Sequence, residues 1–224
     1  MERQIRVTGK GKISVAPDLI RLNIKAEGIY KTYEETLKKS AEETGILRKT
    51  FEKAGLDSKD LKTRKFDINS EYESYRDKKS NKYVEEFVGY KYEHRTFIEF
   101  PNDNKQLGRV LYELSVCDIK VAFSIRHTVK DVEKVKNELL AKAIEDSKIK
   151  AEVLSKAAGV RLGEIVSINY SWGELDIISR DCFEIAPVAA GSACIDDCCS
   201  SYDIDIEADD IDVTDTVTVV WEIR

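Results

Sequence analysis

Strand-type and helix-type hydrophobic patterns alternate along this chain, and their order restricts the fold more than any other feature. The first strand pattern, Ile5–Ala16, has apolar residues at alternate positions, and Leu19–Ile29 follows it after the turn residues Pro17-Asp18. Two strands joined by so short a turn predict a hairpin. A helix pattern comes next over Glu34–Ala54, where apolar residues recur three and four positions apart.

The alternation continues to the end of the chain. Further strands are predicted over Asp60–Tyr75, Val84–Phe100, Ile119–His127, Gly163–Tyr170 and Thr216–Ile223, and further helices over Asn104–Val116 and Asp131–Ala158. The charged stretch Arg76–Lys82 predicts a solvent-exposed hairpin tip between the two longest strands. Hairpins that alternate with single helices predict an α+β fold, with an antiparallel or mixed β-sheet and amphipathic helices packed on one face. Because there is no low-complexity linker, residues 1–224 are expected to form a single domain.

Two of the predicted helices have apolar stripes that indicate their buried faces. The stripe of the first helix is Leu37, Ala41, Thr44, Leu47, Phe51 and Ala54, and that of the longest helix is Val132, Val135, Leu139, Ala143, Ala151, Leu154 and Ala158. Each helix is followed by a glycine that can adopt the left-handed conformation of a helix end. We therefore expect both stripes to face the core.

The distribution of charge argues against two kinds of partner. The net charge is −6, but residues 174–215 hold 13 acidic residues and one basic residue, Arg180, so the remainder is moderately basic. The acidic segment would repel phosphates and the basic remainder has no single Lys/Arg stripe, so nucleic acid is not an expected partner. The longest stretch without a formal charge, Ile185–Ile195, is far shorter than the roughly 20 residues that span a bilayer. Membrane insertion is not expected, and an opening segment without the apolar core of a signal peptide predicts a cytoplasmic location.

A set of short motifs resembles the SIMPL-domain (DUF541) family in both content and order. The motifs are Val7-Thr8-Gly9-Lys10-Gly11, Val15-Ala16-Pro17-Asp18, Ala54-Gly55-Leu56, Asp60-Leu61-Lys62-Thr63, Val88-Gly89-Tyr90, Lys150-Ala151-Glu152, Ala157-Ala158-Gly159-Val160, Leu162-Gly163-Glu164-Ile165 and the closing Val217-Thr218-Val219-Val220-Trp221-Glu222. Each motif alone is weak evidence, whereas the ordered set is specific. Together they cover roughly residues 4–173 and 211–224.

The resemblance implies a SIMPL-like fold and a protein without an established catalytic activity. Members of the family are described as oligomer-forming proteins linked to envelope or oxidative-stress responses and, in animals, to a signalling-kinase partner. We therefore expect a non-catalytic homo-oligomer, linked to stress response or protein–protein interaction, with no cofactor. The chain departs from the family in its divergent acidic, cysteine-containing segment, residues 174–210, and in Asp209-Asp210, which replace a frequent Pro-Gly.

Two features that resemble catalytic or cofactor sites are better explained by structure. Gly9-Lys10-Gly11 matches half of a dinucleotide-binding motif, but no helix follows it, and glycines within a strand more often mark a bulge or a close backbone approach. His94 and His127 each alternate with apolar residues on a predicted strand, which is typical of ordinary sheet histidines.

The cysteines give the alternative function. Cys194, Cys198 and Cys199, here called the cysteine cluster, lie within six residues of one another, and deprotonated thiols at this spacing could hold a soft metal or form a redox pair. The neighbouring Asp196 and Asp197 disfavour thiolates, and no local histidine or CxxC pair completes a metal site, so we interpret the cluster as a loop without a defined role. Cys117 is interpreted as a small buried apolar residue.

The acidic alternation between Asp203 and Asp212 is interpreted as the solvated face of an edge strand. Calcium binding needs six to eight converging oxygens, and the sequence has no EF-hand loop.

Overall fold

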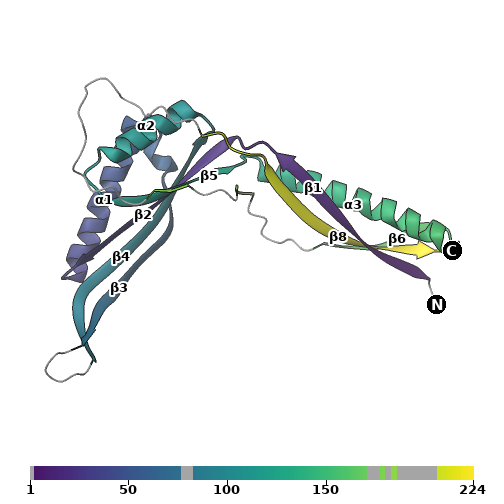
Figure 1. Ribbon diagram of the computed structural model, residues 1–224, viewed down its shortest axis with the longest axis horizontal. Coiled ribbons are helices and arrows are strands. Elements are labelled where there is room, and N and C mark those ends of the chain that lie inside the picture. The colour runs from purple at the N-terminus through teal and green to yellow at the C-terminus, as the bar shows by residue number, and fades with distance from the viewer. Residues whose placement is uncertain (1–2, 77–82, 171–176, 180–182, 186–205) are drawn as a thin grey trace. The chain divides into compact units, whose positions relative to one another are not determined.

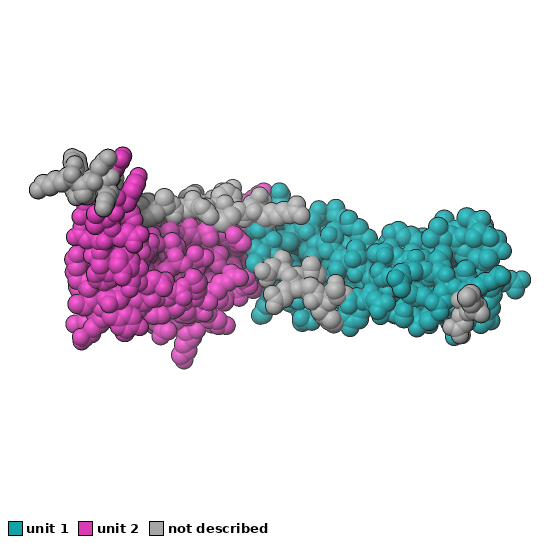
Figure 2. All heavy atoms as spheres, turned by 90° about the horizontal axis from the view of Figure 1, so that it is seen from below, with its two compact units in different colours: residues 1–18, 128–180, 208–224 teal, residues 19–127, 181–207 magenta. Residues whose placement is uncertain are grey.

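The computed structural model describes residues 3–76, 83–170, 177–179, 183–185 and 206–224. These residues form two antiparallel sheets and three α-helices, which is the predicted α+β class with two sheets in place of one. The chain makes two compact units (Figure 2): unit 1 comprises residues 1–18, 128–180 and 208–224, and unit 2 comprises residues 19–127 and 181–207. Both units are built from segments distant in sequence, and the single-domain organisation of residues 1–224 stays a prediction.

Unit 1 is a three-stranded sheet covered by one long helix (Figure 1). Its strands lie in the order β1 (Gln4–Val15), β8 (Ile211–Ile223) and β6 (Leu162–Tyr170), and helix α3 (Val132–Ala157) packs on β1 and β8. Strand β1 pairs with β8 along its whole length, from Gln4 opposite Glu222 to Val15 opposite Ile211. The buried residues between sheet and helix include Val7, Ile13, Leu139, Ala143, Ala151, Val213, Val217, Val219 and Trp221.

Unit 2 contains a five-stranded sheet with two helices on one face (Figure 1). The strands lie in the order β3 (Lys62–Arg76), β4 (Tyr83–Pro101), β2 (Leu19–Tyr30), β5 (Val121–Thr128) and β7 (Phe183–Ile185), and the helices are α1 (Tyr33–Lys53) and α2 (Asn104–Ser115). A short 3₁₀ helix, Ser58–Asp60, precedes β3. The core under the helices includes Ile20, Leu22, Ile24, Leu47, Phe51, Tyr92, Ile98, Leu107, Val110 and Ile125.

The predicted hairpin of the first two strands is wrong, because β1 pairs with β8 while β2 pairs with β4. The chain leaves one sheet for the other at Pro17-Asp18. The backbone N–H of Asp18 donates to the carbonyl of Thr128 at 3.2 Å, and the Asp18 carboxylate accepts from the N–H of Lys130 at 2.7 Å. These long-range hydrogen bonds hold a turn that the local pattern alone cannot distinguish from a hairpin turn. The second predicted hairpin is confirmed as β3–β4, and its tip, residues 77–82, lies outside the described residues.

Helix α3 approaches β1 closely because glycines stand where the two backbones meet. A Cβ atom on Gly9 would lie 1.9 Å from the carbonyl oxygen of Ala143, and one on Gly11 would lie 2.2 Å from that of Leu139. Any side chain at either position would overlap the helix backbone. The interpretation of Gly9-Lys10-Gly11 as a close backbone approach is therefore confirmed.

The predicted buried face of α3 is correct at Leu139, which is fully buried, and wrong at Leu154, which is 49% exposed. The buried positions near the end of the helix are Ser147, Ala151 and Ser155. After Leu139, every buried side chain of α3 is small. In this part of the helix, side-chain size rather than apolarity therefore decides which face is buried.

Strand β8 is longer than predicted and lies in a different place. It begins at Ile211 rather than Thr216 and occupies the centre of its sheet, between β1 and β6. Asp212 accepts a hydrogen bond from Ser14 at 2.8 Å and forms an ion pair with Lys12 at 3.2 Å, so its exposed carboxylate belongs to a central strand and not to an edge. None of the helices in the described part of the chain is long and apolar enough to cross a membrane.

Candidate interaction surface

The β3–β4 hairpin of unit 2 carries the features most suited to contact with another molecule. The last pair between β2 and β4 is Tyr30 with Tyr90, whereas β3 and β4 stay paired as far as Arg76 with Tyr83. The end of the hairpin is therefore a two-stranded arm that extends past the first turn of α1 (Figure 1). Because β3 comes first in the order of the described strands, its outer edge faces away from the sheet.

One face of the arm carries exposed aromatic rings. The ring of Phe87 lies 5.5 Å from that of Tyr72 and 5.3 Å from that of Tyr90, in edge-to-face geometry. Tyr90 in turn contacts Tyr33 at the start of α1, with ring centroids 5.8 Å apart. Tyr72 is 57% exposed and Phe87 is 42% exposed, so the rings form a contiguous apolar surface in contact with solvent. We call Tyr33, Tyr72, Phe87 and Tyr90 the aromatic surface.

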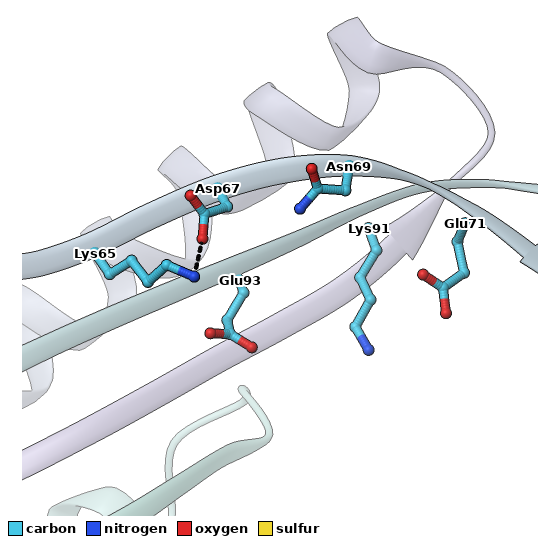
Figure 3. A pocket seen from close by; sticks show the side chains of 6 residues that line it. All are labelled: Lys65, Asp67, Asn69, Glu71, Lys91 and Glu93. Carbon is cyan, nitrogen blue, oxygen red and sulfur yellow. Dashed lines mark ion pairs between the residues drawn. The ribbon is translucent and has the colours of Figure 1, made fainter.

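The opposite face of β3 and β4 is charged and shallow. Lys65, Asp67, Asn69 and Glu71 of β3, with Lys91 and Glu93 of β4, line a depression of about 190 Å³ (Figure 3). Lys65 forms an ion pair with Asp67, and Lys25 of β2 reaches Glu27 at 2.9 Å and Glu93 at 3.4 Å. Burial raises the pKa of Glu93, but Arg95 and Lys25 outweigh it, and the net pKa lies below the usual range. The six lining residues include no histidine, and their only nucleophilic groups are the two lysine amines, which are held in ion pairs. This face of the strands is therefore a solvated charged surface.

A polar network lies between α1 and the sheet. The hydroxyls of Tyr92 and Tyr30 both donate to the carboxylate of Glu43, and the two rings stack with centroids 6.5 Å apart. Burial, followed by the hydrogen bond and charge of Glu43, raises the pKa of Tyr92 well above its usual value. Both phenols therefore stay protonated as hydrogen-bond donors, and Glu43 holds α1 against β2 and β4.

The two histidines lie on inward faces of strands, as the sequence interpretation expected. His94 lies between two threonine hydroxyls, with Nδ1 3.2 Å from Oγ1 of Thr44 and Nε2 2.9 Å from Oγ1 of Thr63. His127 is 2% exposed. Burial lowers the pKa of both imidazoles, which favours the neutral form. We call His94 and His127 the buried histidines.

The cysteine cluster, Cys194, Cys198 and Cys199, lies outside the described residues, as does Cys182, so its role stays a prediction. Cys117 is described: it is half-buried, and its thiol donates to the carbonyl of Leu114 at 3.0 Å. Burial raises the pKa of this thiol and so disfavours the reactive thiolate. Among the described residues, no group of three or more His, Cys, Asp or Glu side chains is placed to hold a metal ion.

No sequence motif predicted the aromatic surface. The sequence did contain an indication of this exposure, because Tyr72 and Phe87 lie beside the segment predicted to be a solvent-exposed hairpin tip. Large aromatic residues at such a tip cannot all reach a core, and their exposure follows from that position.

Known proteins resemble this chain over most of its length. The sequence profile of the SIMPL family, described as a protein of unknown function (DUF541), matches residues 5–221. The 26 kDa periplasmic immunogenic protein of Brucella abortus (strain S19) is 28% identical over 166 residues, and the protein of the same name from Brucella melitensis biotype 1 is 27% identical over 166 residues. Each match covers 74% of this chain and 66% of the relative, so the chain spans just under two thirds of these relatives.

The predicted cytoplasmic location is wrong. Both relatives are named as periplasmic proteins, which contradicts the prediction. The prediction depended on the pattern of the opening residues, and residues 4–15 form β1 of unit 1. A strand pattern of this kind reports how a segment packs and carries no information about the compartment.

The ordered motifs, from the glycines of β1 to the closing residues of β8, are the basis of the predicted resemblance, and the profile match agrees with it. The matched range also includes the divergent segment 174–210. The chain belongs to the SIMPL (DUF541) family.

Proposed function

We propose that this protein is a non-catalytic assembly module that forms homo-oligomers and uses the β3–β4 arm as a contact surface. The aromatic surface is the observation that carries the proposal. Contiguous exposed apolar patches on folded proteins mark interaction sites, and aromatic residues are enriched in the centres of protein–protein interfaces. Exposed glutamates are close to these rings in sequence: Glu34 and Glu35 follow Tyr33 in α1, and Glu85 lies two residues before Phe87 on the same face of β4. They give the patch the charged rim typical of such interfaces.

The titratable groups support a structural role over catalysis. Glu43 accepts hydrogen bonds from two tyrosines, and the imidazole of His94 is held by two threonines. A general acid or base needs access to a substrate proton, and these groups are committed to contacts between α1 and the sheet. The family description and the relatives' names state no reaction either.

We place the protein in the periplasm on the basis of the relatives' names. A homo-oligomer, a further protein partner and a link to stress response are the finer parts of the proposal. Of these, self-association is the part that the arm makes directly testable.

Light scattering on the full chain across a wide concentration range tests the proposal. The expected result is a mass that is a multiple of the 25.5 kDa chain and that decreases on dilution. The double variant Tyr72→Ser/Phe87→Ser should dissociate at a higher protein concentration than the wild type. A matched control, Ile149→Ser/Val153→Ser, removes two apolar side chains of α3 that are at least half exposed and should leave the mass unchanged. A wild-type mass of 25.5 kDa at every concentration would overturn the proposal.

A further inference from the structure

Strand β3 offers an outer edge whose regular part is short and well defined. Its pairing with β4 shifts register between Thr63 and Lys65 and again between Glu71 and Tyr72. Between these irregularities lies a regular segment, residues 65–71, with Ile68 at its middle. A bulge bends a strand and interrupts further pairing, so the segment available to an added strand is limited to these residues.

The charges along this segment are poorly matched by the neighbouring strand. Lys65 lies directly opposite Arg95, and Asp67 lies directly opposite Glu93. Like charges in directly opposite positions destabilise a strand pair. The ion pairs form instead along each strand, from Lys65 to Asp67 and from Arg95 to Glu93. The charged row of β3 would therefore gain from a strand on its outer side that carries opposite charges.

A second copy of the same strand supplies those charges. We propose that β3 pairs antiparallel with β3 of a second copy, about a two-fold axis at Ile68. This inference rests on the proposed homo-oligomer and names one of its contacts, next to the aromatic surface. Lys65 then lies opposite Glu71 of the second copy, Asp67 opposite Asn69, and each pair occurs twice because of the symmetry. The residues lining the depression in Figure 3 then become part of this interface.

The charges select this register against its neighbours. A shift of two residues in one direction places Asp67 opposite Glu71 of the second copy, and a shift in the other direction places Asp67 opposite itself. Both alternatives bring carboxylates together. Charged side chains on an edge strand usually prevent pairing with other strands. Here their order, with Lys65 at one end and Glu71 at the other, disfavours the two shifted registers and favours the same strand reversed.

Side chains on the other face of β3 add apolar contacts to the same interface. Ile68 meets Ile68 of the second copy on the axis, and Phe66, which is 42% exposed, lies opposite Ser70. Phe66 is already held by the ring of His94, with centroids 5.2 Å apart and the planes nearly perpendicular. Its position is fixed before association, which reduces the entropy lost on binding.

Charge reversal tests the register in the full chain. Lys65→Glu and Glu71→Lys should each raise the dissociation constant of the oligomer by at least about tenfold, because each creates two like-charge contacts. The double variant Lys65→Glu/Glu71→Lys restores opposite charges and should recover an affinity close to that of the wild type. Both side chains are on the solvated face of the strand, so the fold should be retained. Lys148→Glu, at an exposed position of α3, serves as the control for a change of net charge.

A cross-link tests the axis independently. Ile68→Cys should form a disulfide-linked dimer on mild oxidation, with the 68–68 bond identified by peptide mapping, because directly opposite strand residues meet the distance requirement of a disulfide. Ser74→Cys is the control: in this register two such residues lie about 40 Å apart and should not link to each other.

Several outcomes would overturn the inference. A wild-type oligomer that is insensitive to both single reversals refutes β3 pairing and leaves the homo-oligomer standing. A disulfide-linked dimer from the Ser74→Cys variant, with none from the Ile68→Cys variant, would also refute this pairing of β3 and leave the homo-oligomer standing. A wild-type protein that is monomeric throughout refutes both the pairing and the proposed function.

Discussion

Replacing Gly9 by alanine should destabilise unit 1 more than the addition of one methyl group ordinarily does. The new Cβ would lie 1.9 Å from the carbonyl oxygen of Ala143, 2.6 Å from the backbone nitrogen of Ser147 and 2.8 Å from its Cβ. Two of these atoms belong to the helix backbone and cannot rotate away. An ordinary contact of about 3.5 Å would require α3 to move about 1.6 Å away from β1.

That movement would separate side chains that are now in contact. Val7, Ala143, Ala151 and Val217 form one buried cluster between β1, β8 and α3. Overpacking a well-packed core costs about 1–3 kcal/mol, and a rigid backbone on one side of the contact favours the upper end. We therefore expect Gly9→Ala to lower the free energy of unfolding by about 3 kcal/mol.

Urea unfolding measures the effect, with tryptophan fluorescence as the probe because the buried Trp221 lies in β8 of the same unit. Gly45→Ala is the matched control. Gly45 lies within α1, and a Cβ there meets no described atom within 4 Å, so alanine should stabilise the helix by about 0.5–1 kcal/mol. If Gly9→Ala folds and unfolds at the wild-type urea concentration, the close approach of β1 and α3 does not have the energetic role assigned to it.

Four further predictions can be checked with standard measurements. Leu139→Ala should lower the free energy of unfolding by about 2–5 kcal/mol, whereas Leu154→Ala, at a half-exposed position, should change it by less than about 0.5 kcal/mol; equal effects in urea melts would contradict the observed helix face. Stability should decrease as the pH falls below 6.5, because the buried histidines bind protons less readily in the folded chain than in the unfolded one, and His94→Gln should weaken this dependence in melts run as a pH series. Serine at all three positions of the cysteine cluster should leave stability, native mass and metal content unchanged; one tightly held metal per wild-type chain, found by elemental analysis, would contradict the passive-loop interpretation. If residues 1–224 form a single domain, calorimetry should record one unfolding transition, and two separate transitions would show that the units unfold independently.

The positions of strands and helices could be predicted because they depend on local periodicity, whereas the pairing of strands could not. The sequence around Pro17-Asp18 is compatible with a hairpin, and what decides against it is hydrogen bonding to Thr128 and Lys130, more than 100 residues away. The central place of β8 depends in the same way on partners at both ends of the chain. Leu154 was misplaced because the spacing between α3 and the sheet, set by the glycines of β1, is a tertiary property.

The interaction surface was missed for a related reason. Tyr72 and Phe87 lie beside the predicted hairpin tip, but how far the exposed part of the hairpin extends depends on where β2 ends relative to β3 and β4. The charges of β3 can be read from the sequence. Their order, with Lys65 at one end and Glu71 at the other, indicates a pairing only once β3 is known to lie at the edge of a sheet. The histidines and the glycine pair were interpreted correctly because strand alternation alone assigns them to an inward face or a close approach.

The pairing of β1 with β8 separates the folding of unit 1 from that of unit 2. Residues 19–127, which make up most of unit 2, find their partners within one continuous segment, so their sheet and helices can form without β8. Strand β1 must wait for a partner about 200 residues later, and closing that loop has a substantial entropic cost. Until then its alternating apolar residues have no sheet to join. The interval before β1 pairs with β8 is therefore the period when a newly made chain is most exposed to aggregation or proteolysis.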